Sequence, residues 1–217
     1  MRTSLQYSVL LIVFLGAASL AQQSASPAAP DAKPAAKPDV KLVAPPVAVD
    51  DKFVKERFGD QFTLMPQFPG MVADLDGDGV EDLVLAARAK SPMLDEGSMG
   101  YKVVDPYNGF FGFGDPHITA GFGADDPTRK GEVLLVIHGA GSEAWHSDKP
   151  KAKFVLINLP YKTVGLRRVM INKKAVMAIA MEEYGAMQDT SAVYWDGNLK
   201  KKKPGTYKYE PLGASME

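Results

Sequence analysis

Residues 71–85 read MVADLDGDGVEDLVL, in which five acidic side chains fall within nine positions and an apolar run lies on either side. The acidic residues are Asp74, Asp76, Asp78, Glu81 and Asp82. Carboxylates crowded onto one turn repel each other, and their pKa values rise unless a cation neutralises them. The segment therefore predicts two short strands joined by a loop that binds a positive ion.

The spacing of the acidic residues indicates which ion the loop binds. Aspartates at loop positions 1, 3, 5 and 9, with glycine at position 6, place hard oxygen ligands around one ion, and the carbonyl of position 7 adds another. The predicted ligands are the side chains of Asp74, Asp76, Asp78 and Asp82 and the carbonyl oxygen of Val80, with Gly79 as the glycine. Ligation by oxygen alone, with a flexible coordination number, favours Ca²⁺ over Zn²⁺ and Mg²⁺.

Residues 72–87, VADLDGDGVEDLVLAA, resemble the calcium loop of FG-GAP and VCBS repeats, which form the blades of integrin-like β-propellers. The resemblance implies a calcium ion that clamps a loop between two strands, with a structural rather than a catalytic purpose. The loop is not an EF-hand loop, because Leu85 stands where that loop requires glutamate. One motif is too few for the roughly four or more blades of a propeller. A blade-like unit, a small β-sandwich or a partial propeller is expected instead of a complete propeller.

Outside this loop, short runs rich in β-branched and aromatic residues predict further strands, separated by turn-forming residues. The predicted strands are, in chain order, residues 61–64, 71–74, 82–87, 132–138, 153–159, 167–171, 175–182, 192–195 and 206–210. Residues 176–184 fit either a strand or a helix. Asp50 as N-cap predicts one short helix over residues 52–58. The expected fold class is mainly β, with antiparallel sheet and one short N-terminal helix.

Residues 91–131 show little regular pattern and are dense in glycine and aromatic residues. Loops of this length inside a compact domain are usually functional or disordered. The aromatic residues from Tyr101 to Phe122 either stack on a glycan or a protein partner, or fold back to complete the core. We take this Tyr101–Phe122 loop as the expected contact surface.

A second motif suggests a different class of function. His138-Gly139-Ala140-Gly141 follows an apolar strand and resembles the oxyanion-hole loop of α/β-hydrolases, which implies a small esterase. The chain has no G-x-S-x-G nucleophile elbow, and the 76 residues after Gly141 are too few for the rest of that fold. We therefore prefer a non-enzymatic binding module, keep the esterase as the alternative, and note that a purely structural domain fits too.

Composition excludes several classes of protein. A net charge of −1 and a pI of about 6.3 leave no basic field to attract nucleic acid. The absence of cysteine excludes disulfides, thiolate nucleophiles and cysteine-based zinc sites. Hydrophobic residues at 46% and charged residues at 24% are typical of a globular protein.

The N-terminal residues 1–21, MRTSLQYSVLLIVFLGAASLA, have the pattern of a secretory signal peptide cleaved near Ala21. Their apolar run is too short to cross a bilayer, so no transmembrane span is expected after cleavage. Residues 22–49 are rich in proline and alanine and predict a disordered linker. Residues 50–217 then form the predicted calcium-binding β domain, in a protein that is periplasmic or secreted.

The signal peptide gives a first testable prediction. Cleavage after Ala21 makes Gln22, within one or two residues, the N-terminus of the exported protein. Mass spectrometry of the protein recovered outside the cytoplasm measures this end directly. Recovery of the chain with Met1 intact would instead indicate a membrane anchor.

Overall fold

The computed structural model describes residues 47–113, 115–117, 122, 126–185, 189–197 and 205–213. The predicted signal peptide and nearly all of the predicted linker lie outside these residues. At the described end of that linker, Val47 forms an isolated antiparallel bridge with Gly70. Hydrogen-bonded structure is therefore present at Val47, before the predicted boundary at residue 50.

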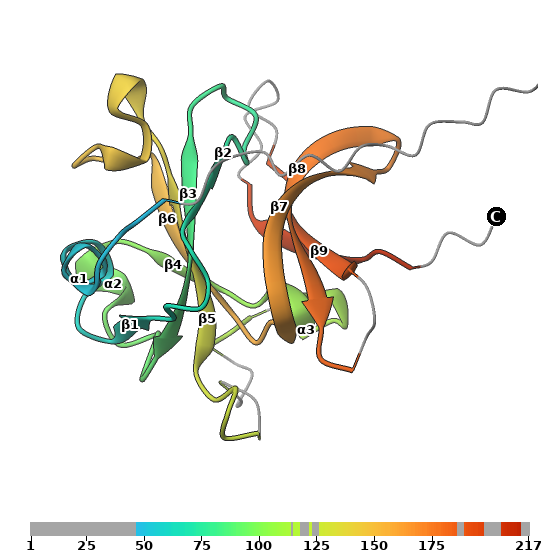
Figure 1. The fold of residues 1–217 in the computed structure, drawn as a ribbon, viewed down its shortest axis with the longest axis horizontal. Coiled ribbons are helices and arrows are strands. Elements are labelled where there is room, and N and C mark those ends of the chain that lie inside the picture. Colours follow the sequence, from blue (N-terminus) through green and yellow to red (C-terminus); the bar gives the residue numbers. More distant parts are fainter. Residues whose placement is uncertain are drawn as a thin grey trace, which may run out of the picture. The chain divides into compact units, whose positions relative to one another are not determined.

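The described part of the chain is mainly β (Figure 1). In chain order its elements are α1 (Asp51–Phe58), β1 (Phe62–Leu64), β2 (Met71–Ala73), β3 (Asp82–Ala89), α2 (Glu96–Met99), β4 (Lys102–Val104), α3 (Pro106–Phe110), β5 (Glu132–His138), the 3₁₀ helix η1 (Gly141–His146), β6 (Ala152–Ile157), β7 (Tyr161–Ile171), β8 (Lys174–Glu183), β9 (Asp189–Trp195) and β10 (Tyr207–Pro211). Among these described helices, none has the length and apolar character needed to span a membrane.

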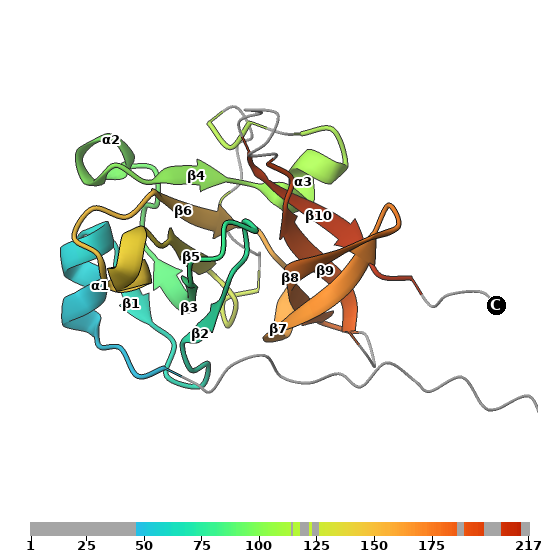
Figure 2. The same ribbon diagram turned by 90° about the horizontal axis from the view of Figure 1, so that it is seen from above.

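The strands form two sheets. The first has the order β1-β3-β5-β6-β4, with β2 also paired to β3, and the second has the order β10-β9-β8-β7. All pairs are antiparallel except β4 with β6. Figures 1 and 2 show the first sheet between α1 on one side and the second sheet on the other. The predicted antiparallel, mainly β fold class is confirmed, and the arrangement is consistent with a partial blade or a sandwich.

The central strands of the first sheet are buried on both faces, which explains their unbroken apolar runs. Every residue of β5 is buried, and β3 is buried apart from the half-buried Arg88. Alternate side chains such as Val84 and Leu134 face the second sheet, and their neighbours such as Leu83 and Leu135 face α1. One sheet therefore contributes to two hydrophobic cores.

The N-terminal helix forms as predicted from its cap. The Asp50 side chain accepts a hydrogen bond from the Phe53 N–H at 2.8 Å, which satisfies one free donor of the first turn. Val54 and Phe58 are fully buried, and the Phe58 ring packs edge-on against Phe62 of β1. The cap and this apolar face together dock the helix on the first sheet.

Tight turns decide where some strands end. Asn172 and Lys173 both have positive φ, 49° and 64°, as a two-residue type I′ turn requires, and they join β7 to β8. By contrast, the Asp196-Gly197 pair that follows β9 is of a type common in two-residue hairpin turns, but it does not form one. The Asp196 N–H donates to the Thr206 carbonyl at 3.0 Å, so a longer loop joins β9 to β10.

The segment from 91 to 131 contains more regular structure than the sequence indicates. The short helices α2 and α3 lie within it, and β4 between them pairs in parallel with β6. The sequence does not predict β4, because the glycine- and aromatic-rich residues around it show no alternating pattern and its pairing with the distant β6 decides its conformation. β7 also begins at Tyr161, earlier than the predicted start at residue 167.

The double-sided burial of the first sheet predicts a large cost for a cavity there. Leu135 of β5 is fully buried, so Leu135→Ala is expected to lower the free energy of unfolding by about 2–5 kcal/mol. Leu94 is 70% exposed, so Leu94→Ala is expected to change it by less than about 0.5 kcal/mol. Urea denaturation of both variants measures the difference, and equal stabilities would contradict this packing.

Candidate metal centre

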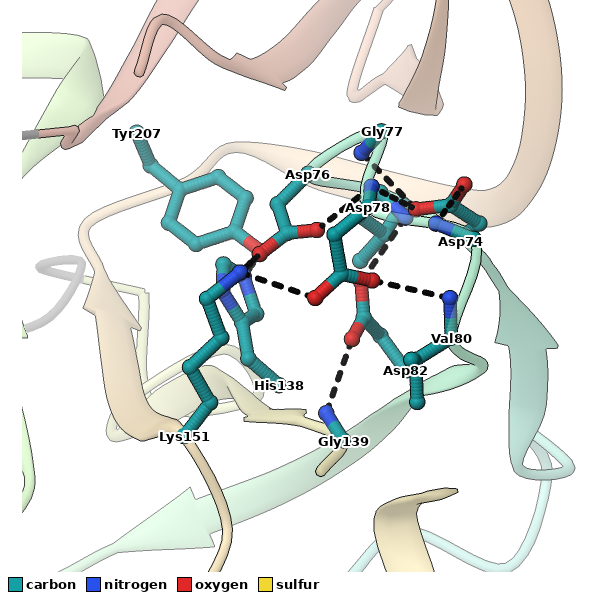
Figure 3. Close-up of polar contacts among 12 residues, drawn as sticks. Asp74, Asp76, Gly77, Asp78, Val80, Asp82, His138, Gly139, Lys151 and Tyr207 are labelled. Atoms are coloured by element: carbon teal, nitrogen blue, oxygen red, sulfur yellow. Dashed lines mark hydrogen bonds and ion pairs between the residues drawn. The ribbon is translucent and has the colours of Figure 1, made fainter. Parts of the chain in front are cut away.

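The loop between β2 and β3 wraps around the side chain of Asp74 (Figure 3). Its carboxylate accepts hydrogen bonds from the backbone N–H groups of Gly77 at 2.7 Å, Asp78 at 3.1 Å and Gly79 at 2.9 Å. Gly77 and Gly79 have φ of 77° and 87°, which other residues rarely adopt. The two glycines therefore allow the tight curl that turns the acidic side chains toward each other.

The curl brings three of the predicted ligands together. Asp74, Asp76 and Asp78 each offer a carboxylate oxygen, and these oxygens lie within 4.8 Å of one another. Calcium–oxygen bonds of about 2.3–2.6 Å allow ligands on opposite sides of one ion to be up to about 5 Å apart. The donor set, three carboxylates on one tightly curled loop, therefore fits Ca²⁺ in both chemistry and spacing.

The structure places the other two predicted ligands at the end of the loop. Val80 donates its N–H to Asp78 Oδ1 at 2.8 Å. Asp82 is 1% exposed, and its two carboxylate oxygens accept hydrogen bonds from the N–H groups of Leu75 at 2.8 Å and Gly139 at 2.9 Å. Asp82 thus joins the loop, β3 and the end of β5.

The environment of Asp82 is dominated by its burial. Burial raises its pKa to about 6, although the attraction of His138 and the two backbone hydrogen bonds act in the opposite direction.

Gly139 has to be glycine at its contact with Asp82, because a Cβ atom there would meet the Ala144 carbonyl carbon at 2.7 Å and the Glu81 backbone more closely still. The glycine at position 139 therefore allows the backbones of Glu81 and Ala144 to approach this part of the chain closely.

Asp76 is the most buried acid of the cluster of three, with a side chain that is 1% exposed. Its Oδ2 atom contacts the ammonium group of Lys151 and lies 3.4 Å from His138 Nδ1. Burial alone would raise the pKa of Asp76, but hydrogen bonds and Coulombic attraction from His138 and Lys151 outweigh it and hold the pKa well below its usual range. Asp76 therefore stays ionised although its side chain is almost completely shielded from solvent.

Lys151 brings a positive charge into the centre from the start of β6. Its ammonium group contacts Asp76 Oδ2 and lies 2.9 Å from Asp78 Oδ2 (Figure 3). Burial acts to lower the pKa of Lys151, but the hydrogen bonds to Asp76 and Asp78 raise it. Lys151 is therefore the cation that contacts two of the three clustered carboxylates in this structure.

His138 connects the loop to the second sheet. Its side chain is 1% exposed, and its Nε2 atom lies 2.6 Å from the hydroxyl of Tyr207 on β10. Burial raises the pKa of Tyr207 well above its ordinary value, so the phenol keeps its proton. The other ring nitrogen of His138, Nδ1, faces Asp76 Oδ2. A chain of polar contacts thus runs from the loop to β10.

The residues around the cluster of three could not be found from local spacing. Lys151 lies 75 positions from Asp76, and Tyr207 lies 69 positions from His138. The sequence indicates His138 as part of a possible oxyanion-hole loop, and not as a contact of the acidic loop. The one signal available for Lys151 is that a buried carboxylate requires a cation, which does not say where in the chain the cation lies.

Two N–H groups of the loop that resembles an oxyanion hole are already hydrogen-bonded. The Gly139 N–H donates to Asp82, and the Ala140 N–H donates to the Ala144 carbonyl at 3.0 Å. An oxyanion hole requires such groups to point at the reacting oxygen. The geometry therefore gives no support to the esterase alternative.

The structure divides the Tyr101–Phe122 loop into buried and exposed parts. The Tyr101 ring is 2% exposed and packs against Phe58 and Phe62. Phe110 and Phe111, at the end of α3, are 49% and 56% exposed. Their rings pack with Tyr107 and Tyr209, and these four residues are named here the α3 patch. A cleft of about 400 Å³ lies between α3 and β10 beside the patch.

Comparisons with protein-family models, with curated proteins and with solved structures give no match. The interpretation of the centre therefore depends on its geometry and on the local resemblance of residues 72–87. Both concern the same loop.

The double role of Asp82 as acceptor gives a prediction that is independent of any metal. Asp82→Ala leaves two buried N–H groups without a partner, so it is expected to lower the free energy of unfolding in EDTA by about 2–4 kcal/mol. The neighbouring Glu81 is exposed, and Glu81→Ala is the matched control with little expected effect. Urea denaturation distinguishes them, and similar curves would rule out a bracing role for Asp82.

Proposed function

We propose that this protein is an exported, non-enzymatic β domain that binds Ca²⁺ in its β2–β3 loop and presents the α3 patch to a protein or glycan partner. The observation that carries the proposal is the convergence of the Asp74, Asp76 and Asp78 carboxylates within 4.8 Å. Their chemistry and spacing match those expected from the D-x-D-G-D pattern in the sequence.

Charge balance favours a divalent ion at this position. The Lys151 ammonium group supplies one positive charge to a cluster of three carboxylates. It contacts Asp76 and Asp78, whereas Asp74 accepts hydrogen bonds from backbone N–H groups. A calcium ion supplies two positive charges and, when bound, cross-links the loop through oxygen ligands. Extracellular calcium modules bind with Kd on the order of 10⁻⁴–10⁻³ M, so millimolar calcium outside the cell is the relevant concentration.

The surroundings of the loop support a structural purpose for the ion. Asp82 ties the loop to β5, and the contact of Asp76 with His138 continues to β10 of the second sheet. A ligand that fixes this loop therefore strengthens the junction of the two sheets. The N–H groups of Gly139 and Ala140 donate to Asp82 and Ala144, so they do not point at a reacting oxygen as an esterase would need.

The α3 patch supports the binding part of the proposal. Phe110 and Phe111 expose about half of each side chain on a helix that contacts the second sheet through Tyr107 and Tyr209. Exposed aromatic groups held on a rigid support are typical of surfaces that stack on sugars or dock on protein. The adjacent cleft gives such a partner room beside β10.

Thermal melting in calcium and in EDTA tests the proposal. Ca²⁺ at about 10–100 times Kd stabilises the folded state by about 1.4–2.7 kcal/mol, so Tm is expected to rise by about 3–10 °C when Ca²⁺ is in that excess over Kd. Magnesium at the same concentration is expected to act much more weakly, because it gives up its water ligands reluctantly.

Two isosteric variants serve as test and control for the melting experiment. Asp78→Asn removes one ligand charge and is expected to abolish most of the calcium-dependent shift. Glu81→Gln removes a charge from an exposed residue outside the cluster and is expected to keep the shift. Identical wild-type melting curves in Ca²⁺ and EDTA would refute calcium binding.

A further inference from the structure

The cation at the acidic loop comes from the protein itself. The Lys151 ammonium group touches one carboxylate oxygen of Asp76 and one of Asp78, two of the three proposed calcium ligands. Ammonium and calcium ions both require negatively charged oxygen at close range. A calcium ion on these ligands would therefore lie beside the lysine charge, and the two cations repel each other.

Only the side chain of Lys151 is free to leave. Its backbone N–H donates to the His138 carbonyl at 3.0 Å, next to the β5–β6 pairing of His138 with Ala152. The side chain is 35% exposed, whereas that of Asp76 is 1% exposed. The lysine can therefore turn its charge toward water while the buried carboxylate stays in place.

We propose that Lys151 is a tethered competitor of the metal, and that Ca²⁺ binds by displacing its ammonium group from Asp76 and Asp78. This inference rests on the proposed function, because it concerns the same loop. The apparent Kd equals the intrinsic Kd divided by the fraction of molecules whose site is free. A lysine that leaves the site in about a tenth of the molecules weakens binding about tenfold.

Such a competitor also gives the loop a partner in the absence of metal. With Lys151 in place, the buried charge of Asp76 is neutralised and the loop keeps its hydrogen bonds. Calcium then exchanges one cation for another and does not have to fold the loop. In this sense Lys151 is a specificity-determining residue. A divalent ion has to compete with its positive charge for the carboxylates of Asp76 and Asp78.

Isothermal titration with CaCl₂ on the purified exported protein tests the proposal. Lys151→Met removes the charge and keeps an unbranched side chain, so it is expected to bind Ca²⁺ at least about tenfold more tightly than the wild type. Lys151→Gln repeats the test with a polar neutral side chain. Lys149→Met removes an exposed lysine two positions away and is expected to bind like the wild type, which controls for the loss of net charge.

Melting of the same variants provides a readout that a purely structural lysine would not give. In EDTA, Lys151→Met is expected to lower Tm by several degrees, because Asp76 loses its main counter-charge. In saturating Ca²⁺ this deficit is expected to disappear. A lysine with only a structural role would lower Tm equally under both conditions.

The outcomes separate this proposal from the proposed function. Tighter binding by Lys151→Met or Lys151→Gln, with unchanged binding by Lys149→Met, supports displacement. Equal or weaker binding by both Lys151 variants, while the wild type binds Ca²⁺, overturns displacement and leaves the calcium site standing. No binding by any of the proteins overturns both.

Discussion

A carboxylate taken almost completely out of water is the constraint on which the arrangement around the acidic loop depends. The Asp76 side chain is 1% exposed and remains ionised, and a buried charge is tolerated only when other groups compensate it. Compensation comes from Lys151 at the start of β6 and from His138 at the end of β5. The other ring nitrogen of His138, Nε2, contacts the hydroxyl of Tyr207 on β10. One charge therefore fixes the relative positions of the β2–β3 loop and strands from both sheets.

A second buried carboxylate has a different task in the same place. Asp82 accepts hydrogen bonds from the backbone N–H groups of Leu75 and Gly139, which lie in separate parts of the chain. Each of its two carboxylate oxygens accepts one of these bonds. Asp74 acts similarly within the loop through its three backbone donors. Asp74 thus shapes the backbone and also belongs to the cluster of three, whereas Asp82 shapes the backbone outside that cluster. The sequence spacing alone does not separate these roles.

Local patterns made most of the fold predictable from the sequence. The helix after Asp50, the loop and the apolar runs of β3 and β5 each carry a signal within about ten residues. The three-residue strand β4 and the first half of β7 carry no such signal, because their pairing with β6 and β8 decides their conformation. Within the site, the aspartates were predictable for the same reason. Lys151 was not, because it is joined to them only by the folding of distant strands.

The position of β3 in the first sheet has a consequence for the order of folding. β3 pairs with β5, but about forty residues separate the end of one from the start of the other. During synthesis, β3 therefore emerges as a nearly continuous apolar segment whose main partner does not yet exist. Pairings of this separation close slowly, and an unpaired apolar strand is a hazard for aggregation while it waits. β1 and β2, which precede β3 in the chain, can already pair with it, so the edge of β3 that pairs with β5 is the one left open until β5 is made.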